Sequence, residues 1–374
     1  MLFKNLVLFS ISTFLISCSV NTNETIIINT NQINTFSSNT DIYKNLDNYI
    51  DKINKDNKFN GSVYLKANNI DYKKSIGFSD FNKKLKIDEN TSFNIASCSK
   101  QFTSFGIMLL KERNKLNYDD KITKYIPELK LFSNITIRHL LNQVSGIPDY
   151  LSKEIDPFIN DYFNKNKSKS MKNKDIVNIL SNYNIKPMFK PLEKFDYSNT
   201  NAVLLAYIIE KIEKTSFKDF IEKNIFKKLD MSDSFVLNID SPPINRALGY
   251  NSTNSGYEIN DLSFYDGVVG DGNIYISIND FIKWEESLYT EKLIKQSSLL
   301  EAFNKITLKD GTQSSYGFGW DMINSNVMFH NGSWLGFRSF IIRNINNKFV
   351  LIILNNSSND LDKISQEIIS VIQK

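Results

Sequence analysis

The sequence predicts an α+β fold: one mainly antiparallel sheet, a helix from each chain end packed on it, and an inserted all-helical subdomain. Three observations support this prediction. Strand-length blocks occur near the start of the chain and again toward its end. Short turns separate neighbouring blocks, which favours hairpins over βαβ crossovers. Between the two groups of blocks, apolar residues recur mostly at helical spacing.

The composition is that of a globular protein with a sizeable core. The chain has 374 residues, of which 41% are hydrophobic and 23% are charged. One large domain or two closely packed subdomains fit this length. The 45 basic and 41 acidic residues give a net charge of +4, and this near-balance gives no reason to expect nucleic acid as a partner.

Residues 1–17 have the pattern of a targeting segment. Lys4 precedes a short apolar run, Leu6–Leu15, and the run ends at Ser17 and Cys18. Because this run is too short to span a bilayer, we expect a cleaved signal peptide. The ending resembles a bacterial lipobox, which would make Cys18 a lipidated N-terminus that anchors an exported protein in the membrane of the cell envelope. Ordinary secretion, with Cys18 incidental, is the alternative.

Residues 18–40 are rich in Asn, Thr and Ser, and we expect them to form a flexible tether. The predicted catalytic domain is then 41–374. Its first element is an amphipathic helix that begins near Asp41. Two strands, Gly61–Ala67 and Tyr72–Gly77, follow as a hairpin. A further helix is expected to start at Ser97.

The middle of the chain is predicted to be mostly helical. Expected helices are Ile135–Asn142, Asn199–Lys214 and Phe217–Leu229. Asn164–Lys174 contains five lysines and is expected to be a solvated loop or lid, with binding of anionic envelope polymers as the alternative.

The end of the chain is predicted to return to sheet and to close with a helix at Leu361–Ile372. The expected strands are Asn273–Ser277, Gly317–Met322, Val327–His330, Gly336–Arg343 and Lys348–Asn355.

Ser97 and Lys100 are a candidate nucleophile and its amine partner. Residues three apart share one face of a helix, so the amine can reach the serine hydroxyl. A lysine held there can take part in removing the serine proton. By itself this spacing is common, and a solvated helix start is its usual meaning.

Two further clusters add polar groups. Tyr197 and Asn199 are expected in the turn that leads into the Asn199–Lys214 helix, where a tyrosine can act as a base and an amide can bind substrate or Lys100. A helix cap is the alternative for this pair. His330, Gly332 and Ser333 follow an expected strand. Gly332 allows close approach of a ligand, and the Ser333 N–H can face an oxyanion; a plain β-turn is the alternative.

No metal or cofactor is expected. The chain has only two cysteines, Cys18 and Cys98, and two histidines, His139 and His330. This excludes a three-histidine zinc site, and no HExxH or CxxC pattern is present. We expect His139 to be packed and hydrogen-bonded, and Cys98 to be a buried small residue rather than a nucleophile.

The three clusters together resemble the serine β-lactamase and D-Ala-D-Ala peptidase superfamily, in its class C β-lactamase-like branch. This branch includes penicillin-binding-protein-like peptidases and family VIII esterases. The resemblance covers residues 41–374 and implies a β-lactamase/transpeptidase-like fold. It is carried by Phe93–Lys100, Tyr197–Asn199 and His330–Gly332, with support from Tyr118–Pro127, Ile135–Leu141, Ser145–Tyr150 and Gly270–Tyr275.

The resemblance also implies a role for each residue. Ser97 would be the acylated nucleophile, Lys100 would hold the proton network, and Tyr197 would be the general base. Asn199 would orient Lys100 and bind the substrate amide, and the N–H groups of Ser97 and Ser333 would form the oxyanion hole.

His330 stands where class C β-lactamases have a lysine. Since a neutral imidazole attracts a substrate carboxylate less than an ammonium does, the expected substrates are D-amino-acid peptides, including peptidoglycan-derived ones, or small esters. A β-lactamase and a non-catalytic penicillin- or peptidoglycan-binding lipoprotein are the alternatives.

Overall fold

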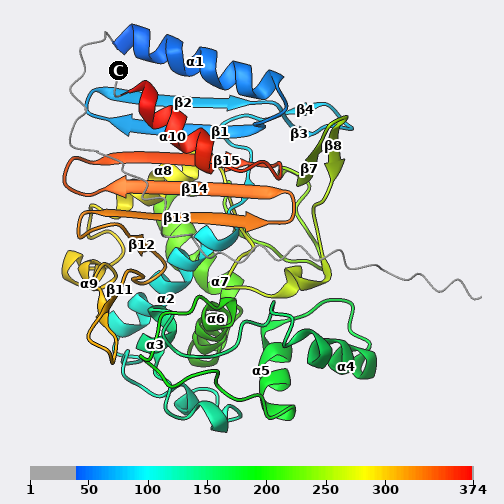
Figure 1. Ribbon diagram of the computed structural model, residues 1–374, viewed down its shortest axis with the longest axis vertical. Helices are drawn as coiled ribbons and strands as arrows, with labels where there is room; N and C mark the ends of the chain where they lie inside the picture. The colour runs from blue at the N-terminus through cyan, green and yellow to red at the C-terminus, as the bar shows by residue number, and fades with distance from the viewer. Residues whose placement is uncertain (1–38, 373–374) are drawn as a thin grey trace, which may run out of the picture.

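The computed structural model describes residues 39–372, and its centre is a six-stranded antiparallel sheet in the order β12-β13-β14-β15-β1-β2 (Figure 1). β1 pairs with β15, for example at Val63 and Ile353, so strands from both ends of the chain meet in mid-sheet. This confirms the predicted fold class. The six strands are β1 (Gly61–Ala67), β2 (Ile70–Ile76), β12 (Asp321–Met322), β13 (Val327–Trp334), β14 (Phe337–Asn344) and β15 (Phe349–Asn355).

Two terminal helices cover one face of the sheet, α1 (Asn39–Lys55) and α10 (Asp362–Val371) (Figure 1). Both are amphipathic, and their apolar stripes join the inward side chains of β1 and β15 in one buried cluster. Buried members of this cluster are Ile42, Leu46, Ile50, Val63, Leu65, Ile353, Ile364 and Ile368. The predicted packing of a helix from each chain end on the sheet is confirmed.

The opposite face packs on α8 (Ile278–Ser287) and α2 (Lys100–Glu112) in a larger core. The Trp284 ring of α8 packs against the Phe102 ring of α2, with 4.3 Å between the ring centres. α2 also packs closely on α6 (Asn199–Glu213). A Cβ on Gly106 would lie 2.9 Å from Ile209 Cδ1, so glycine permits this close helix contact.

Below the sheet the chain forms the predicted helical part (Figure 1). Its helices are α3 (Ile137–Leu141), α4 (Asp156–Asn166), α5 (Asn173–Asn182), α6 and α7 (Phe217–Ile221). A three-stranded sheet of β5 (Phe93–Asn94), β9 (Ile274–Ile276) and β6 (Phe235–Val236) joins this part to the start of α2.

The remaining elements are short strands and helices outside these layers. They are β3 (Phe78–Asp80), β4 (Leu85–Lys86), β7 (Tyr250–Thr253), β8 (Gly256–Ile259), α9 (Gln296–Glu301), β10 (Ile306–Thr307), β11 (Gln313–Ser314) and the short helical turns η1 (Ala96–Ser99), η2 (Ile122–Lys124), η3 (Lys130–Phe132), η4 (Glu222–Phe226), η5 (Lys227–Leu229) and η6 (Phe264–Gly267).

Three local expectations need correction. The lysine-rich segment 164–174 is not one loop, because α4 extends to Asn166 and α5 begins at Asn173. The helix predicted for Phe217–Leu229 stays α-helical only to Ile221 and continues as a π turn and a 3-10 turn. The strand expected at Gly317–Met322 is reduced to β12, since Gly319 has a φ of +81°.

The signal peptide, the lipidation at Cys18 and nearly all of the tether lie outside the described residues. Among residues 39–372, no helix is both long enough and apolar enough to cross a membrane.

Candidate active site

Ser97 lies in the 3-10 turn η1, directly before α2. Ala96 precedes it with a φ of +47°, an uncommon value for a residue with a Cβ, and Asn94 Oδ1 accepts the Ala96 N–H at 2.8 Å. Ile95 is fixed from two sides: its N–H donates to Ile274 O in β9, and its carbonyl accepts from Ser339 Oγ in β14. The turn that carries Ser97 is therefore held between two sheets.

Lys100 begins α2, and its side chain is only 2% exposed. Its Nζ donates to Ser97 Oγ at 3.0 Å, to Asn199 Oδ1 at 2.8 Å and to the Asp271 carbonyl at 2.8 Å. The three donor positions of the amine are thus all used. The sequence spacing of Ser97 and Lys100 corresponds to a direct contact between the two side chains.

Tyr197 and Asn199 are placed by the loop that leads into α6. Gln143 fixes this loop, because its carbonyl accepts from Asp196 N and its Oε1 accepts from Ser198 N at 3.0 Å. Lys100 Nζ lies 4.9 Å from the centre of the Tyr197 ring. The structure thus brings Ser97, Tyr197 and Asn199 around the ammonium group of Lys100.

His330 lies next to this cluster, but its side chain is buried at 1% exposure. Nδ1 is 2.6 Å from the Asn331 carbonyl oxygen, which can only accept, so Nδ1 carries the hydrogen. Nε2 then accepts from the Tyr316 hydroxyl at 3.0 Å. Burial, with Lys100 as a second cause, lowers the pKa of His330 to about 3, so the imidazole is neutral.

Tyr316 connects His330 to the predicted base. Its ring meets the Tyr197 ring edge-on, with 5.9 Å between the centroids. The imidazole thus contacts Tyr197 both through Tyr316 and directly, with 6.4 Å between the centres of the two rings. Its predicted part in substrate binding remains a prediction.

Gly332 and Ser333 lie on β13 where this strand passes η1. A Cβ on Gly332 would lie 2.4 Å from the Ile95 carbonyl oxygen and 2.3 Å from Ser339 Oγ, so only glycine fits there. β12 pairs with β13 at Met328 and Phe329 only. In the described part of the chain, no strand pairs with this edge of β13 from His330 onward, next to the turn that carries Ser97.

Two aspartates that the sequence did not single out, Asp149 and Asp271, contact the residues of this cluster. Asp149 Oδ2 accepts from Asn199 Nδ2 at 2.8 Å and from Asn199 N at 3.2 Å. Asp271, whose carbonyl binds Lys100, accepts on Oδ2 from the Tyr150 hydroxyl at 2.9 Å. Both aspartates lie in stretches that resemble the superfamily, Ser145–Tyr150 and Gly270–Tyr275, but nothing in their spacing places them beside Lys100.

The pKa values of both carboxyl groups are shifted upward. Burial raises the pKa of Asp149, while the N–H groups of Leu151 and Asn199 and the Lys100 charge oppose this rise. Burial also raises the pKa of Asp271, and Lys100 again opposes it. Lys100 is thus the cation that both carboxylates face.

Cys98 and His139 have the structural roles expected of them. The Cys98 side chain is fully buried, and its Sγ lies 3.4 Å from the His330 carbonyl oxygen. His139 lies in α3, where its Nδ1 accepts from Thr136 N at 3.2 Å and completes a capping box.

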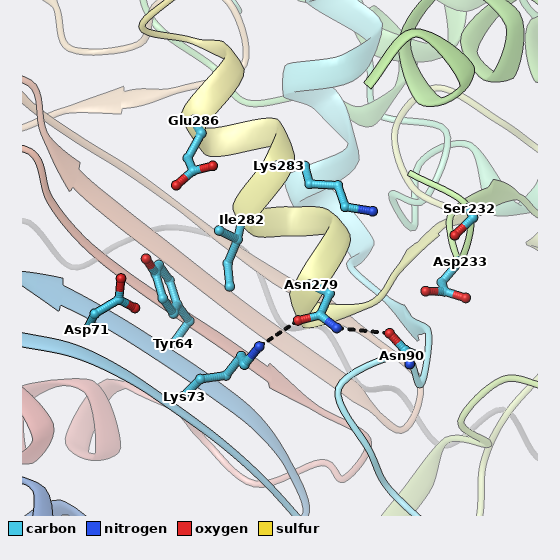
Figure 2. Close-up of a pocket in the computed structure, with 10 residues that line it drawn as sticks. All are labelled: Tyr64, Asp71, Lys73, Asn90, Ser232, Asp233, Asn279, Ile282, Lys283 and Glu286. Atoms are coloured by element: carbon cyan, nitrogen blue, oxygen red, sulfur yellow. Dashed lines mark hydrogen bonds between the residues drawn. The ribbon is translucent and has the colours of Figure 1, made fainter. Parts of the chain in front are cut away.

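A separate polar cavity of about 390 Å³ opens between β1, β2 and the start of α8 (Figure 2). Lys73 and Asn90 bridge across it to Asn279, at 2.7 and 2.9 Å. It contains none of the candidate site residues, and its lining is Tyr64, Asp71, Lys73, Asn90, Ser232, Asp233, Asn279, Ile282, Lys283 and Glu286. Within residues 39–372, no group of three His, Cys, Asp or Glu side chains could hold a metal ion.

Comparison with known proteins gives one consistent result. The family model described as Beta-lactamase matches residues 46–369. Penicillin-binding protein 4* of Bacillus subtilis strain 168 is 34% identical over 336 residues, which cover 85% of this chain and 73% of that protein. Protein flp of Staphylococcus aureus strain NCTC 8325 / PS 47 is 27% identical over 310 residues, or 80% of this chain, and the match spans only 58% of that relative.

A solved structure shares the fold. The D-amino acid amidase from Ochrobactrum anthropi SV3, complexed with L-phenylalanine amide, aligns with a TM-score of 0.72 at 23% identity. The alignment covers 89% of this chain and 99% of the amidase chain.

Proposed function

Because the chain belongs to the β-lactamase family of serine hydrolases, we propose that it hydrolyses D-amino-acid peptides or small esters through an acyl-enzyme on Ser97. The observation that carries this proposal is the contact of 3.0 Å between Lys100 Nζ and Ser97 Oγ, together with the contact of 2.8 Å between Lys100 Nζ and Asn199 Oδ1. This arrangement gives a serine hydroxyl an adjacent group that can exchange its proton.

The proposed reaction has two steps. Ser97 Oγ attacks the substrate carbonyl carbon while Tyr197, as the phenolate that the Lys100 ammonium group favours, takes the Ser97 proton. The bond between the carbonyl carbon and the leaving group then breaks, and the departing amine or alcohol takes this proton from Tyr197. Water then attacks the acyl-enzyme, with Tyr197 again as base, and regenerates Ser97. In both steps the N–H groups of Ser97 and Ser333 would stabilise the negative charge on the carbonyl oxygen.

Two observations support the substrate class. The neutral, buried His330 supplies no positive charge for a β-lactam carboxylate, which favours substrates that do not depend on one. The fold is also that of an enzyme named D-amino acid amidase. Hydrolysis of β-lactams is the second candidate, since the family model bears that name.

We also propose that the protein is exported and held in the cell envelope by a lipid on Cys18, as the pattern of residues 1–18 suggests. Expression of the full chain and its Cys18→Ala variant in a bacterial host, followed by fractionation, tests this. We expect the wild type in the membrane fraction with a lipid-sized mass increase on its N-terminal peptide, and no such increase in the variant. An unlipidated Cys18 in a processed wild type would overturn the anchor.

The nucleophile is tested with a fluorophosphonate probe and intact mass measurement. We expect one adduct on the wild type and none on Ser97→Ala. Equal labelling of both proteins would overturn the assignment of Ser97.

The substrate class is tested with a panel of a short acyl ester, a D-Ala-D-Ala peptide and a chromogenic cephalosporin. We expect turnover of the ester or the peptide to exceed that of the cephalosporin. Cephalosporin hydrolysis as the fastest reaction would instead identify a β-lactamase, and labelling without any turnover would favour a binding protein.

A further inference from the structure

Asp149 fixes the orientation of the Asn199 amide. An ionised carboxylate only accepts hydrogen bonds, so the Asn199 atom at 2.8 Å from Asp149 Oδ2 must be the NH2 group. The amide oxygen of Asn199 then necessarily faces Lys100, at 2.8 Å. An amide turned the other way would place its NH2 group against the lysine amine.

This orientation decides what Lys100 can do. Asn199 Oδ1 and the Asp271 carbonyl are both pure acceptors, so they occupy two N–H groups of the amine. The third position of Nζ is left facing Ser97 Oγ at 3.0 Å. While Asn199 keeps this orientation, the Lys100 amine is therefore held with one of its positions toward Ser97 Oγ.

The loop that carries Asp149 is itself attached to the first turn of α6. Thr200 Oγ1 donates to the Pro148 carbonyl at 2.7 Å and accepts from Tyr150 N at 2.8 Å. Leu151 N donates to the second carboxylate oxygen of Asp149 at 3.0 Å. Asp149 thus has donors on both oxygens, which an amide at this position could not satisfy.

We propose that Asp149 is a positioning residue for the hydrolysis at Ser97, and that it acts by locking the Asn199 amide with its oxygen toward Lys100. The proposal rests on the proposed function, because Ser97 must be the nucleophile for the effect on rate to be seen. The charged and titratable groups around Lys100 are Asp149, Asp271, Tyr150, Tyr197 and His330.

The test compares kcat/KM across pH, on the best substrate of the panel, for wild type, Asp149→Asn and Asp271→Asn. Either aspartate variant removes a carboxylate that faces Lys100, so Asp271→Asn controls for the lost carboxylate. Only Asp149→Asn also places an amide N–H donor against a neighbouring N–H donor. The plateau of its kcat/KM should therefore fall by about 100-fold, as for a misplaced catalytic group. Asp280→Asn is the matched control, since Asp280 is a buried carboxylate that accepts from Asp233 N and Ser234 Oγ rather than from a residue that contacts Lys100. It should keep the wild-type plateau.

A double-mutant cycle separates positioning from general structural damage. In an Asn199→Ala background, Asp149→Asn should lower the plateau by less than threefold more, since the group it orients is already gone. A full additional 100-fold loss, or a wild-type plateau in Asp149→Asn alone, would overturn the proposal.

The unfolding free energies of the wild type, Asp149→Asn, Asn199→Ala and the double variant provide a readout that needs no turnover. They should show a non-additive interaction between Asp149 and Asn199, and strict additivity would contradict the contact. Failure of the proposed function would give a different result. Ser97→Ala would then react with the fluorophosphonate probe or turn over substrate like the wild type, while the non-additive interaction between Asp149 and Asn199 persisted.

Discussion

His330 enters the folded protein as a neutral imidazole between Tyr316 and a backbone carbonyl, and this has a consequence for stability at acid pH. Its pKa falls from 6.5 in the unfolded chain to about 3 in the folded protein. Between pH 3 and pH 6.5 the unfolded chain binds more protons at His330 than the folded protein does. The contribution of His330 to the free energy of unfolding is therefore fully present above pH 6.5 and is lost as the pH falls toward 3. The contribution lost between pH 7 and pH 5 is about 2 kcal/mol.

We therefore predict that His330→Gln loses about 2 kcal/mol less unfolding free energy than the wild type between pH 7 and pH 5. Glutamine can still accept from Tyr316 but does not titrate, so the difference between the two slopes isolates this histidine. Urea unfolding at both pH values measures it. Parallel slopes for the two proteins would show that the imidazole is protonated in the fold.

At the scale of elements, local patterns predicted what they encode directly. Apolar residues at helical spacing predicted α1, α6 and α10 nearly to their ends, and strand-length blocks of alternating or continuous apolar residues predicted β1 and β15. Ser97 was predicted to start a helix, but it lies in the 3-10 turn η1. Ala96 before it is left-handed, with its N–H held by Asn94 Oδ1, and the neighbouring Ile95 is held by β9 and β14, which are distant in the sequence. Asp149 was missed for the same reason, because its partner Asn199 lies in a distant part of the sequence.

The packing of β13 against η1 gives a prediction at this scale. Gly332→Ala would place a methyl group 2.4 Å from the Ile95 carbonyl oxygen, and the strand must move away from the turn that carries Ser97. We expect unfolding free energy to fall by about 1–3 kcal/mol and fluorophosphonate labelling of Ser97 to slow by about tenfold or more.

A second glycine serves as the control. Gly272→Ala should leave stability within about 0.5 kcal/mol, because its Cβ would meet nothing within 4 Å. Adding Ser339→Ala to Gly332→Ala should rescue only part of the loss, since the clash with the Ile95 backbone remains. Complete rescue would show that Ser339 alone sets the distance between β13 and η1.

At the scale of the whole molecule, a buried ion pair joins the sheet to the larger core. Arg343 of β14 and Glu285 of α8 are 1% and 4% exposed at their side chains, and Arg343 Nε donates to Glu285 Oε1 at 3.0 Å. Tyr289 also packs on the guanidinium, 4.7 Å from its ring centre. The pair thus links α8 to the face of the sheet that lies opposite α1 and α10.

Removing one charge of this pair leaves the other buried and uncompensated, which costs far more than removing both. We predict that Glu285→Gln lowers unfolding free energy by about 3–5 kcal/mol, and that the double variant Glu285→Gln/Arg343→Met recovers part of this loss. The kcat/KM of the folded fraction should stay at the wild-type value in both, because neither residue touches the Ser97 cluster. Chemical unfolding followed by both fluorescence and activity measures these quantities. A double variant less stable than Glu285→Gln would mean that the pair, with the ring of Tyr289, stabilises the interface more than an apolar side chain can.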